Sequence, residues 1–167
     1  NVVHVVDMNL QSLTGNLRRQ PEKIRRRYAG WEIIEVRWGR KLQKLFSKPG
    51  GDELERIMIK LRDNGEYHTL LRLAKMRAEE THELLSGEAE DIRAKLLKRA
   101  KPGKRKKLRE LLDQFEDEKA FLEVYTDLGG HDMVEITKAM DRARKVKKRP
   151  VVILYDTIKG YGLSLIH

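Results

Sequence analysis

The chain has 167 residues, no cysteine and a formal net charge of +10, which is enough length for one domain with a sizeable core. The lack of cysteine excludes disulfides and thiolate metal sites, and it agrees with the cytoplasmic location that we expect. No apolar run approaches the roughly 20 residues that a membrane-spanning helix needs, so we expect no membrane partner.

The first part of the chain predicts a strand, a helix and a second strand. Residues 2–6 are nearly all β-branched, which predicts a strand buried on both faces of a parallel sheet. We expect His4 within it to be a core histidine, since one His without a partner motif is poor evidence for a site. A short helix with Pro21 in its first turn follows, and residues 31–38 predict the second strand. The chain enters its first strand at once, and we expect it to be a fragment of a longer polypeptide.

Residues 41–125 predict a charged helical insertion. Leucines and other apolar residues recur there at helical spacing, which is typical of a packing surface. Pro102 and Gly103 divide the later part into two helices. Most of the excess positive charge lies around this turn, between Arg93 and Arg109. Solvated helix faces account for such runs, and a basic module that docks an acidic protein or RNA is the alternative. No aromatic residue interrupts the run to stack on bases, so we do not expect a nucleic-acid partner.

The last part predicts a return to α/β structure. Gly129, Gly130 and His131 form a tight loop, and Asp132 with a Glu three residues later predicts the capped start of a helix. We expect this helix to bury an apolar face that includes Met140. A final apolar strand begins after Pro150 and runs into a glycine-punctuated loop over residues 157–162.

Polar groups follow the carboxyl ends of the first and last strands, where parallel α/β sheets bind ligands. Asp7, Asn9 and Gln11 offer hard oxygen ligands of the kind that Mg²⁺ prefers. Lys159 and its neighbouring glycines are suited to approach a phosphate. If both turns lie on one edge of one sheet, they line a common site.

Four stretches together resemble a known family. They are residues 9–15 with Arg18, the strand 30–39 with its Gly-Trp and Trp-Gly pairs, residues 65–68, and residues 129–132 with 157–162. They resemble the thiamine-diphosphate-dependent enzymes of the transketolase type, and most of all the homodimeric pyruvate dehydrogenase E1 family. The resemblance covers both flanks of the chain well and the middle poorly.

The resemblance implies an α/β fold with a partial parallel, Rossmann-like sheet that binds thiamine diphosphate. Residues 1–167 would be part of the diphosphate-binding domain, with residues 41–125 inserted in it. Asn9 would bind Mg²⁺ through its side-chain oxygen and Gln11 through its backbone carbonyl. Leu13 would pack beside the cofactor, and Lys159 would reach the diphosphate or the substrate as a cofactor-binding and catalytic residue. His131 would be either a second catalytic residue or a helix-start residue that local hydrogen bonds fix.

The activity implied by the resemblance is decarboxylation of a 2-oxo acid such as pyruvate. The acyl group would pass to a lipoyl group on an E2 acyltransferase, and the enzyme would be a homodimer. The family's Gly-Asp-Gly metal motif and its activating Glu do not occur in this chain, so we expect the fragment alone to be inactive. Transketolase-type ketol transfer is the alternative, because that enzyme shares the sheet and a similar Gly-His-Asp loop.

Overall fold

The structure is a computed structural model, and it describes residues 2–12, 15–16, 19–71 and 92–159. The chain divides into two compact units. The first, here called the sheet unit, comprises residues 1–9, 20–44 and 118–167. The second, here called the helical unit, comprises residues 10–19 and 45–117. None of the helices in the described ranges is long and apolar enough to cross a membrane.

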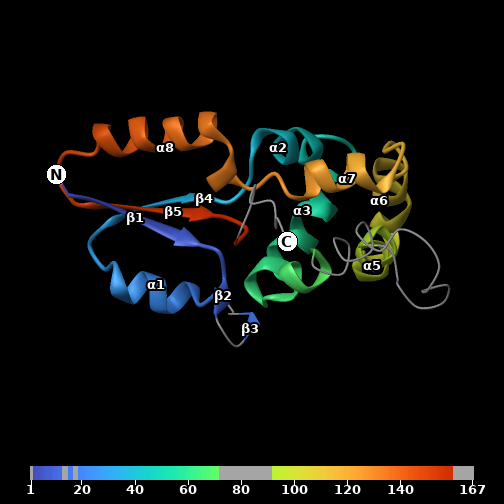
Figure 1. The fold of residues 1–167 in the computed structure, drawn as a ribbon, viewed down its shortest axis with the longest axis horizontal. Helices are drawn as coiled ribbons and strands as arrows, with labels where there is room; N and C mark the ends of the chain where they lie inside the picture. Colours follow the sequence, from blue (N-terminus) through green and yellow to red (C-terminus); the bar gives the residue numbers. More distant parts are fainter. Residues whose placement is uncertain (1, 13–14, 17–18, 72–91, 160–167) are drawn as a thin grey trace, which may run out of the picture. The chain divides into compact units, whose positions relative to one another are not determined.

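The sheet unit contains a parallel sheet of three strands in the order β1-β5-β4 (Figure 1). Their bounds are Val3–Met8 for β1, Val151–Asp156 for β5 and Glu32–Val36 for β4. β5 lies in the centre, and all of its residues are buried. This arrangement confirms the predicted α/β class with a parallel sheet, and it puts the first and last strands of the chain side by side.

β1 is an edge strand of this sheet, and its side chains are mostly exposed. Val3 is 39% exposed and Val5 is 49% exposed, so the prediction that this strand is buried on both faces is wrong. An edge strand has a neighbour on one side only, and β-branched residues alone do not distinguish it from a central strand. His4 is exposed too, although its ring Nδ1 is 3.0 Å from the Tyr28 hydroxyl.

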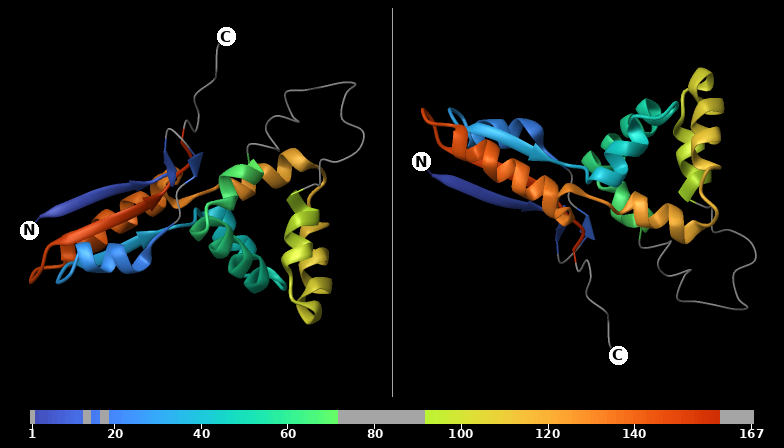
Figure 2. Two further views of the ribbon diagram at one scale, coloured as in Figure 1. Left: turned by 90° about the horizontal axis from the view of Figure 1, so that it is seen from below. Right: turned by 90° about the horizontal axis from the view of Figure 1, so that it is seen from above.

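One helix covers each face of the sheet (Figures 1 and 2). The segment with α1 (Pro21–Arg27) packs on one face, where Tyr28 contacts Val152 and Leu154. On the other face, α8 (Met133–Lys145) packs Ala139 and Ala143 against apolar residues of β4 and β5. Met140 is 38% exposed on α8, so the prediction that this side chain is buried is wrong. The sheet unit also contains α7 (Glu118–Tyr125), the short helix η2 (Gly129–His131) and the start of α2 (Arg40–Phe46).

The helical unit packs α3 (Gly51–Asp63) with α5 (Ile92–Arg99) and α6 (Arg105–Leu112). The short helix η1 (Pro102–Lys104) connects α5 to α6, which confirms the predicted break at Pro102-Gly103. Two short strands, β2 (Gln11–Ser12) and β3 (Gly15–Asn16), pair antiparallel. The predicted leucine stripes form the core of this unit, in which these apolar side chains are buried: Leu54, Ile57, Met58, Leu61, Leu96, Leu108, Leu111 and Leu112.

Candidate functional site at the carboxyl edge of the sheet

The carboxyl ends of β1 and β5 lie next to each other, as the parallel register pairs Met8 with Asp156. The Thr157 hydroxyl donates a hydrogen bond to the Asp7 carboxylate across this edge. The condition for a common site, that the first and last strands end at one edge of the sheet, is therefore met. Ligand sites of open α/β sheets lie at this edge, so the geometry makes it the candidate site.

Asn9 lies just beyond β1 and is half-buried. Its side-chain Nδ2 donates to Asp7 Oδ2 over 3.3 Å. Because the nitrogen faces Asp7, the amide oxygen is turned away from that carboxylate. The next residue, Leu10, is buried and has a φ of +54°, which is uncommon for a residue with a Cβ. The backbone therefore bends sharply directly after Asn9.

The loop 129–132 contacts the carboxyl ends of β4 and β5 directly. The Gly129 N–H donates to the Arg37 carbonyl over 3.0 Å, and a Cβ on Gly129 would lie 2.6 Å from the Val36 carbonyl oxygen. A Cβ on Gly130 would lie 2.8 Å from the Asp156 carbonyl oxygen. Real Cβ atoms do not approach backbone that closely, so both positions require glycine. The loop is held against β4 and β5 without room for a side chain.

His131 connects this loop to the segment after β5. Its ring Nε2 accepts a hydrogen bond from the Ile158 backbone N–H over 2.8 Å. An Nε2 that accepts this bond carries no proton, so the ring is neutral with its proton on Nδ1. His131 thereby holds the chain one residue before Lys159, whose side chain is exposed.

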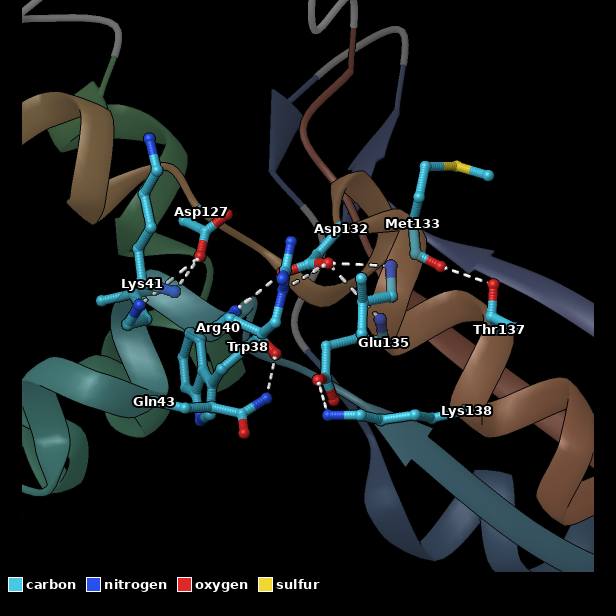
Figure 3. Close-up of polar contacts among 12 residues, drawn as sticks. Trp38, Arg40, Lys41, Gln43, Asp127, Asp132, Met133, Glu135, Thr137 and Lys138 are labelled. Carbon is cyan, nitrogen blue, oxygen red and sulfur yellow. Dashed lines mark hydrogen bonds and ion pairs between the residues drawn. The ribbon is translucent and has the colours of Figure 1, made fainter.

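Asp132 joins the start of α8 to the start of α2 (Figure 3). Its Oδ1 accepts from the Val134 N–H over 2.9 Å, which confirms the predicted helix cap. Its Oδ2 accepts from the Arg40 backbone N–H and from Arg40 Nε, each over 2.9 Å. Burial alone would raise the pKa of Asp132, but the hydrogen bonds from Arg40 and from the α8 backbone lower its pKa to about 2. The carboxylate therefore stays charged near neutral pH.

Asp127 caps α2 in a similar way (Figure 3). Its Oδ2 accepts from the Lys41 N–H over 2.7 Å, and its backbone carbonyl accepts from the Gly39 N–H over 2.7 Å. Leu128 next to it forms an antiparallel bridge with Trp38. The segment 127–132 thus fixes the chain that leaves β4, and it does so with partners about 90 positions away in the sequence.

Comparison with curated proteins shows similarity along almost the whole chain. A pyruvate dehydrogenase E1 component of Corynebacterium glutamicum is 32% identical over 98% of this chain and 16% of its own length. The protein of the same name from Escherichia coli K12 is 29% identical, and the one from Cupriavidus necator is 30% identical, each over 98% of this chain and 16% of the relative. No protein-family model matches the chain.

The chain corresponds to a segment of the pyruvate dehydrogenase E1 component. It spans about a sixth of the length of the curated E1 relatives that it matches, namely 16–17%. The similarity includes the middle of the chain, which the sequence motifs alone covered poorly.

The structure brings together some of the E1 residues predicted from the sequence. Asn9, His131 and Lys159 all lie in the sheet unit. Asn9 follows β1, Lys159 follows β5, and His131 lies in the loop that contacts the ends of β4 and β5. Gln11 lies in β2 of the helical unit, and Leu13 falls outside the described residues, as do residues 160–162 of the closing loop. None of these placements tests a catalytic or cofactor-binding role.

Two charged residues of this E1 segment were not singled out from the sequence, namely Arg40 and Asp127. Arg40 binds Asp132 through its backbone N–H and its side-chain Nε, and Asp127 accepts from the Lys41 N–H at the start of α2. The partners of both residues are distant in the sequence. The available signal was a Trp-Gly pair directly before an Arg-Lys pair at a helix start, which indicates four N–H groups in need of acceptors. It does not indicate which carboxylates supply them.

Proposed function

We propose that the chain forms part of the cofactor domain of an E1 enzyme that depends on thiamine diphosphate and Mg²⁺. The enzyme would decarboxylate pyruvate or a related 2-oxo acid, pass the acyl group to a lipoyl-bearing E2 acyltransferase, and act as a cytoplasmic homodimer. The observation that carries the proposal is the shared edge of β1 and β5, where Asp7, Asn9 and Thr157 meet in a chain of this family.

The residues at this edge fit one part of a metal–diphosphate site. The Asn9 amide oxygen, turned away from Asp7, is a hard ligand of the type that Mg²⁺ takes, and the backbone carbonyl of Gln11 would be a second. Among the described residues, no three His, Cys, Asp or Glu side chains lie close enough to hold a metal ion. We propose that the diphosphate and parts of the E1 protein outside this chain supply the remaining ligands.

The other residues of the edge would hold and orient the ligands. Thiamine diphosphate, when bound, would supply the electron sink for decarboxylation. Lys159 would place its ammonium group near the diphosphate or the carboxylate of the substrate. His131 would set the position of Lys159 through the Ile158 N–H, and the Leu13 side chain would pack beside the cofactor. The tight contact of residues 129–130 with the strand ends would keep water from that side of the edge.

We further infer that residues 41–125 are a helical insertion in this domain. The division of the chain into a sheet unit and a helical unit supports this, because the sheet unit includes segments from both ends of the chain. Most of the proposed insertion, residues 45–117, belongs to the helical unit.

The test uses the full-length protein that carries this segment. We would measure pyruvate decarboxylation with an artificial electron acceptor, together with thiamine diphosphate binding at varied Mg²⁺, for the wild type and Asn9→Ala. A lost metal ligand is expected to weaken cofactor binding about 10- to 100-fold and to reduce activity by a similar factor at limiting Mg²⁺. Asn64→Ala is the matched control, because the Asn64 side chain bonds Glu66 within the helical unit.

An unchanged Mg²⁺ requirement in Asn9→Ala would contradict the assigned role of Asn9. The folded, cofactor-saturated wild type can also fail to decarboxylate pyruvate but transfer ketol units between sugar phosphates. That result would contradict the E1 activity and assign a transketolase activity instead. Loss of activity in Asn64→Ala to the same extent as in Asn9→Ala would show a general effect on folding.

A further inference from the structure

The hairpin formed by α5, η1 and the first turn of α6 concentrates the net charge of the chain. Residues 92–109, here called the basic hairpin, contain ten Lys and Arg residues and neither Asp nor Glu. The remaining 26 Lys and Arg residues balance the 26 Asp and Glu residues of the chain. The formal charge of +10 therefore belongs to this one surface feature of the helical unit.

Eight of the ten cations of the basic hairpin are exposed and two, Arg93 and Lys95, are half-buried, while most of its apolar side chains are buried. Ile92, Leu96, Ala100 and Leu108 are buried. Two cations pair with carboxylates of other elements: Arg99 with Glu66 over 2.5 Å and Lys104 with Asp52 over 2.7 Å. Within the described part of the chain, six further exposed cations form no ion pair, namely Lys98, Lys101, Arg105, Lys106, Lys107 and Arg109.

The turn of the basic hairpin is fixed to α3 by the buried Glu53 and the half-buried Arg56. Glu53 Oε1 accepts from the Lys101 N–H over 2.7 Å, and Arg56 Nη2 donates to the Arg99 carbonyl over 3.1 Å. Glu53 and Arg56 also pair with each other over 2.6 Å. The hydrogen bond from Arg56 lowers the pKa of Glu53 to about 2 against the effect of burial, with help from the Lys101 N–H. The cations are thus presented on a scaffold that is already ordered, which reduces the entropy lost on binding.

We propose that the basic hairpin docks an acidic polypeptide segment of a partner protein. The pairs with Asp52 and Glu66 show that cations of this hairpin accommodate carboxylates from another element. The hairpin has no aromatic side chain on which bases stack, and exposed Glu110 and Asp113 follow it on α6. These carboxylates repel any polyanion, so the lack of an aromatic stacking surface is the observation that favours a polypeptide over RNA. This surface goes beyond the proposed decarboxylation and does not depend on it.

The experiment measures binding of the full-length protein to labelled poly-L-glutamate by fluorescence anisotropy. A single-stranded RNA of equal charge is the comparison, at about 50 mM salt, where the Debye length is about 14 Å. The variant is Arg105→Glu/Lys106→Glu/Lys107→Glu, whose new carboxylates at the start of α6 agree with the helix dipole. The matched control is Arg25→Glu/Arg26→Glu/Arg27→Glu on α1, where three exposed arginines undergo the same change of charge.

We expect the α6 variant to weaken poly-L-glutamate binding at least about tenfold and the α1 control to change it less than about twofold. Circular dichroism and decarboxylation with an artificial acceptor should be unchanged in both variants. An equal loss in both would overturn the proposal, because it would show a response to net charge alone. Tighter binding of RNA than of poly-L-glutamate would overturn it in favour of nucleic acid.

An acidic segment of the chain itself is a competing ligand for the basic hairpin. Six carboxylates lie between Glu79 and Asp91 without an intervening Lys or Arg. In one outcome the wild type does not bind poly-L-glutamate, and changing these six residues to Gln and Asn restores binding. The internal acidic segment then occupies the basic hairpin, and the partner proposal is wrong. If the wild type binds poly-L-glutamate and the neutralised variant binds it with the same affinity, the result supports an external partner.

Discussion

A buried carboxylate connects separate segments in each unit, Asp132 in the sheet unit and Glu53 in the helical unit, but the two join different parts of the chain. Asp132 in the sheet unit binds Arg40, which lies 92 positions earlier. Glu53 in the helical unit binds Arg56, only three positions later on the same helix, and reaches Lys101 through its backbone N–H. A local pair is visible in the sequence as an i,i+3 spacing, whereas the pair of Asp132 exists only once the sheet has assembled. Glu53 reaches Lys101 across 48 positions, about half the separation of Arg40 and Asp132, so the contact at the edge of the sheet spans more of the chain than the one that holds the basic hairpin.

The largest expected effect comes from filling the contact between loop 129–132 and the sheet. Gly129→Ala places a Cβ 2.6 Å from the Val36 carbonyl oxygen and should cost about 3 kcal/mol of unfolding free energy. Gly103→Ala in the helical unit is the matched control, because no atom lies within 4 Å of its Cβ position, and it should stay within about 0.5 kcal/mol. Hydrogen exchange by mass spectrometry on the full-length protein separates the two units. Equal losses of stability in Gly129→Ala and Gly103→Ala would contradict the close packing at Gly129.

Acid should weaken the contacts of the Asp132 carboxylate and those of the Glu53 carboxylate over the same range of pH. The pKa of Asp132 and that of Glu53 are each lowered to about 2 in the folded protein. The unfolded chain therefore binds more protons between about pH 4.5 and 2, so the stability is complete above that range and is lost as the pH falls through it. Each carboxylate should contribute about 2 to 3 kcal/mol.

Hydrogen exchange at stepwise lower pH checks this effect locally. Asp132→Asn should remove the acid dependence at the start of α2 and α8 while leaving the Lys101 amide unchanged. Glu53→Gln should give the reverse pattern. Acid sensitivity that persists in both variants would assign it to other groups.

The smallest effect concerns His131. His131→Ala removes the acceptor for the Ile158 N–H and should speed exchange of that amide about fivefold, which corresponds to about 1 kcal/mol. His131→Gln provides another acceptor and should restore much of the protection. If His131 acts only by positioning Lys159, the Gln variant also keeps most of the decarboxylation activity and its pH profile. If His131→Gln fully protects the Ile158 amide from exchange but abolishes decarboxylation, His131 has a catalytic role.

Local patterns in the sequence predicted much of the architecture. The helix cap at Asp132, the proline in the first turn of α1, the break at Pro102-Gly103 and the leucine stripes of the helical unit follow from neighbours within one or two helical turns. The shared edge of β1 and β5 followed from the rule that parallel strands end on the same side.

The remaining features depend on contacts between distant residues. The order of the strands decides that β5 is central and β1 is at the edge, and the similar apolar runs of the two strands do not reveal it. Capping of α2 by Asp127 joins residues 86 positions apart, and no local spacing marks that pair. The roles of Asn9, Gln11, Leu13, His131 and Lys159 in binding and catalysis stay predictions, because they depend on ligands and on parts of the E1 protein outside this chain.

The exposed edge of β1 has a consequence for work with these residues in isolation. All large apolar side chains that are exposed in the described ranges lie in or beside β1 or on α8: Val2, Val3, Val5, Met133, Val134 and Met140. A flat apolar edge strand is a template for pairing with another chain. The segment expressed alone should therefore self-associate with increasing concentration, and a lysine in place of Val5 should keep it monomeric.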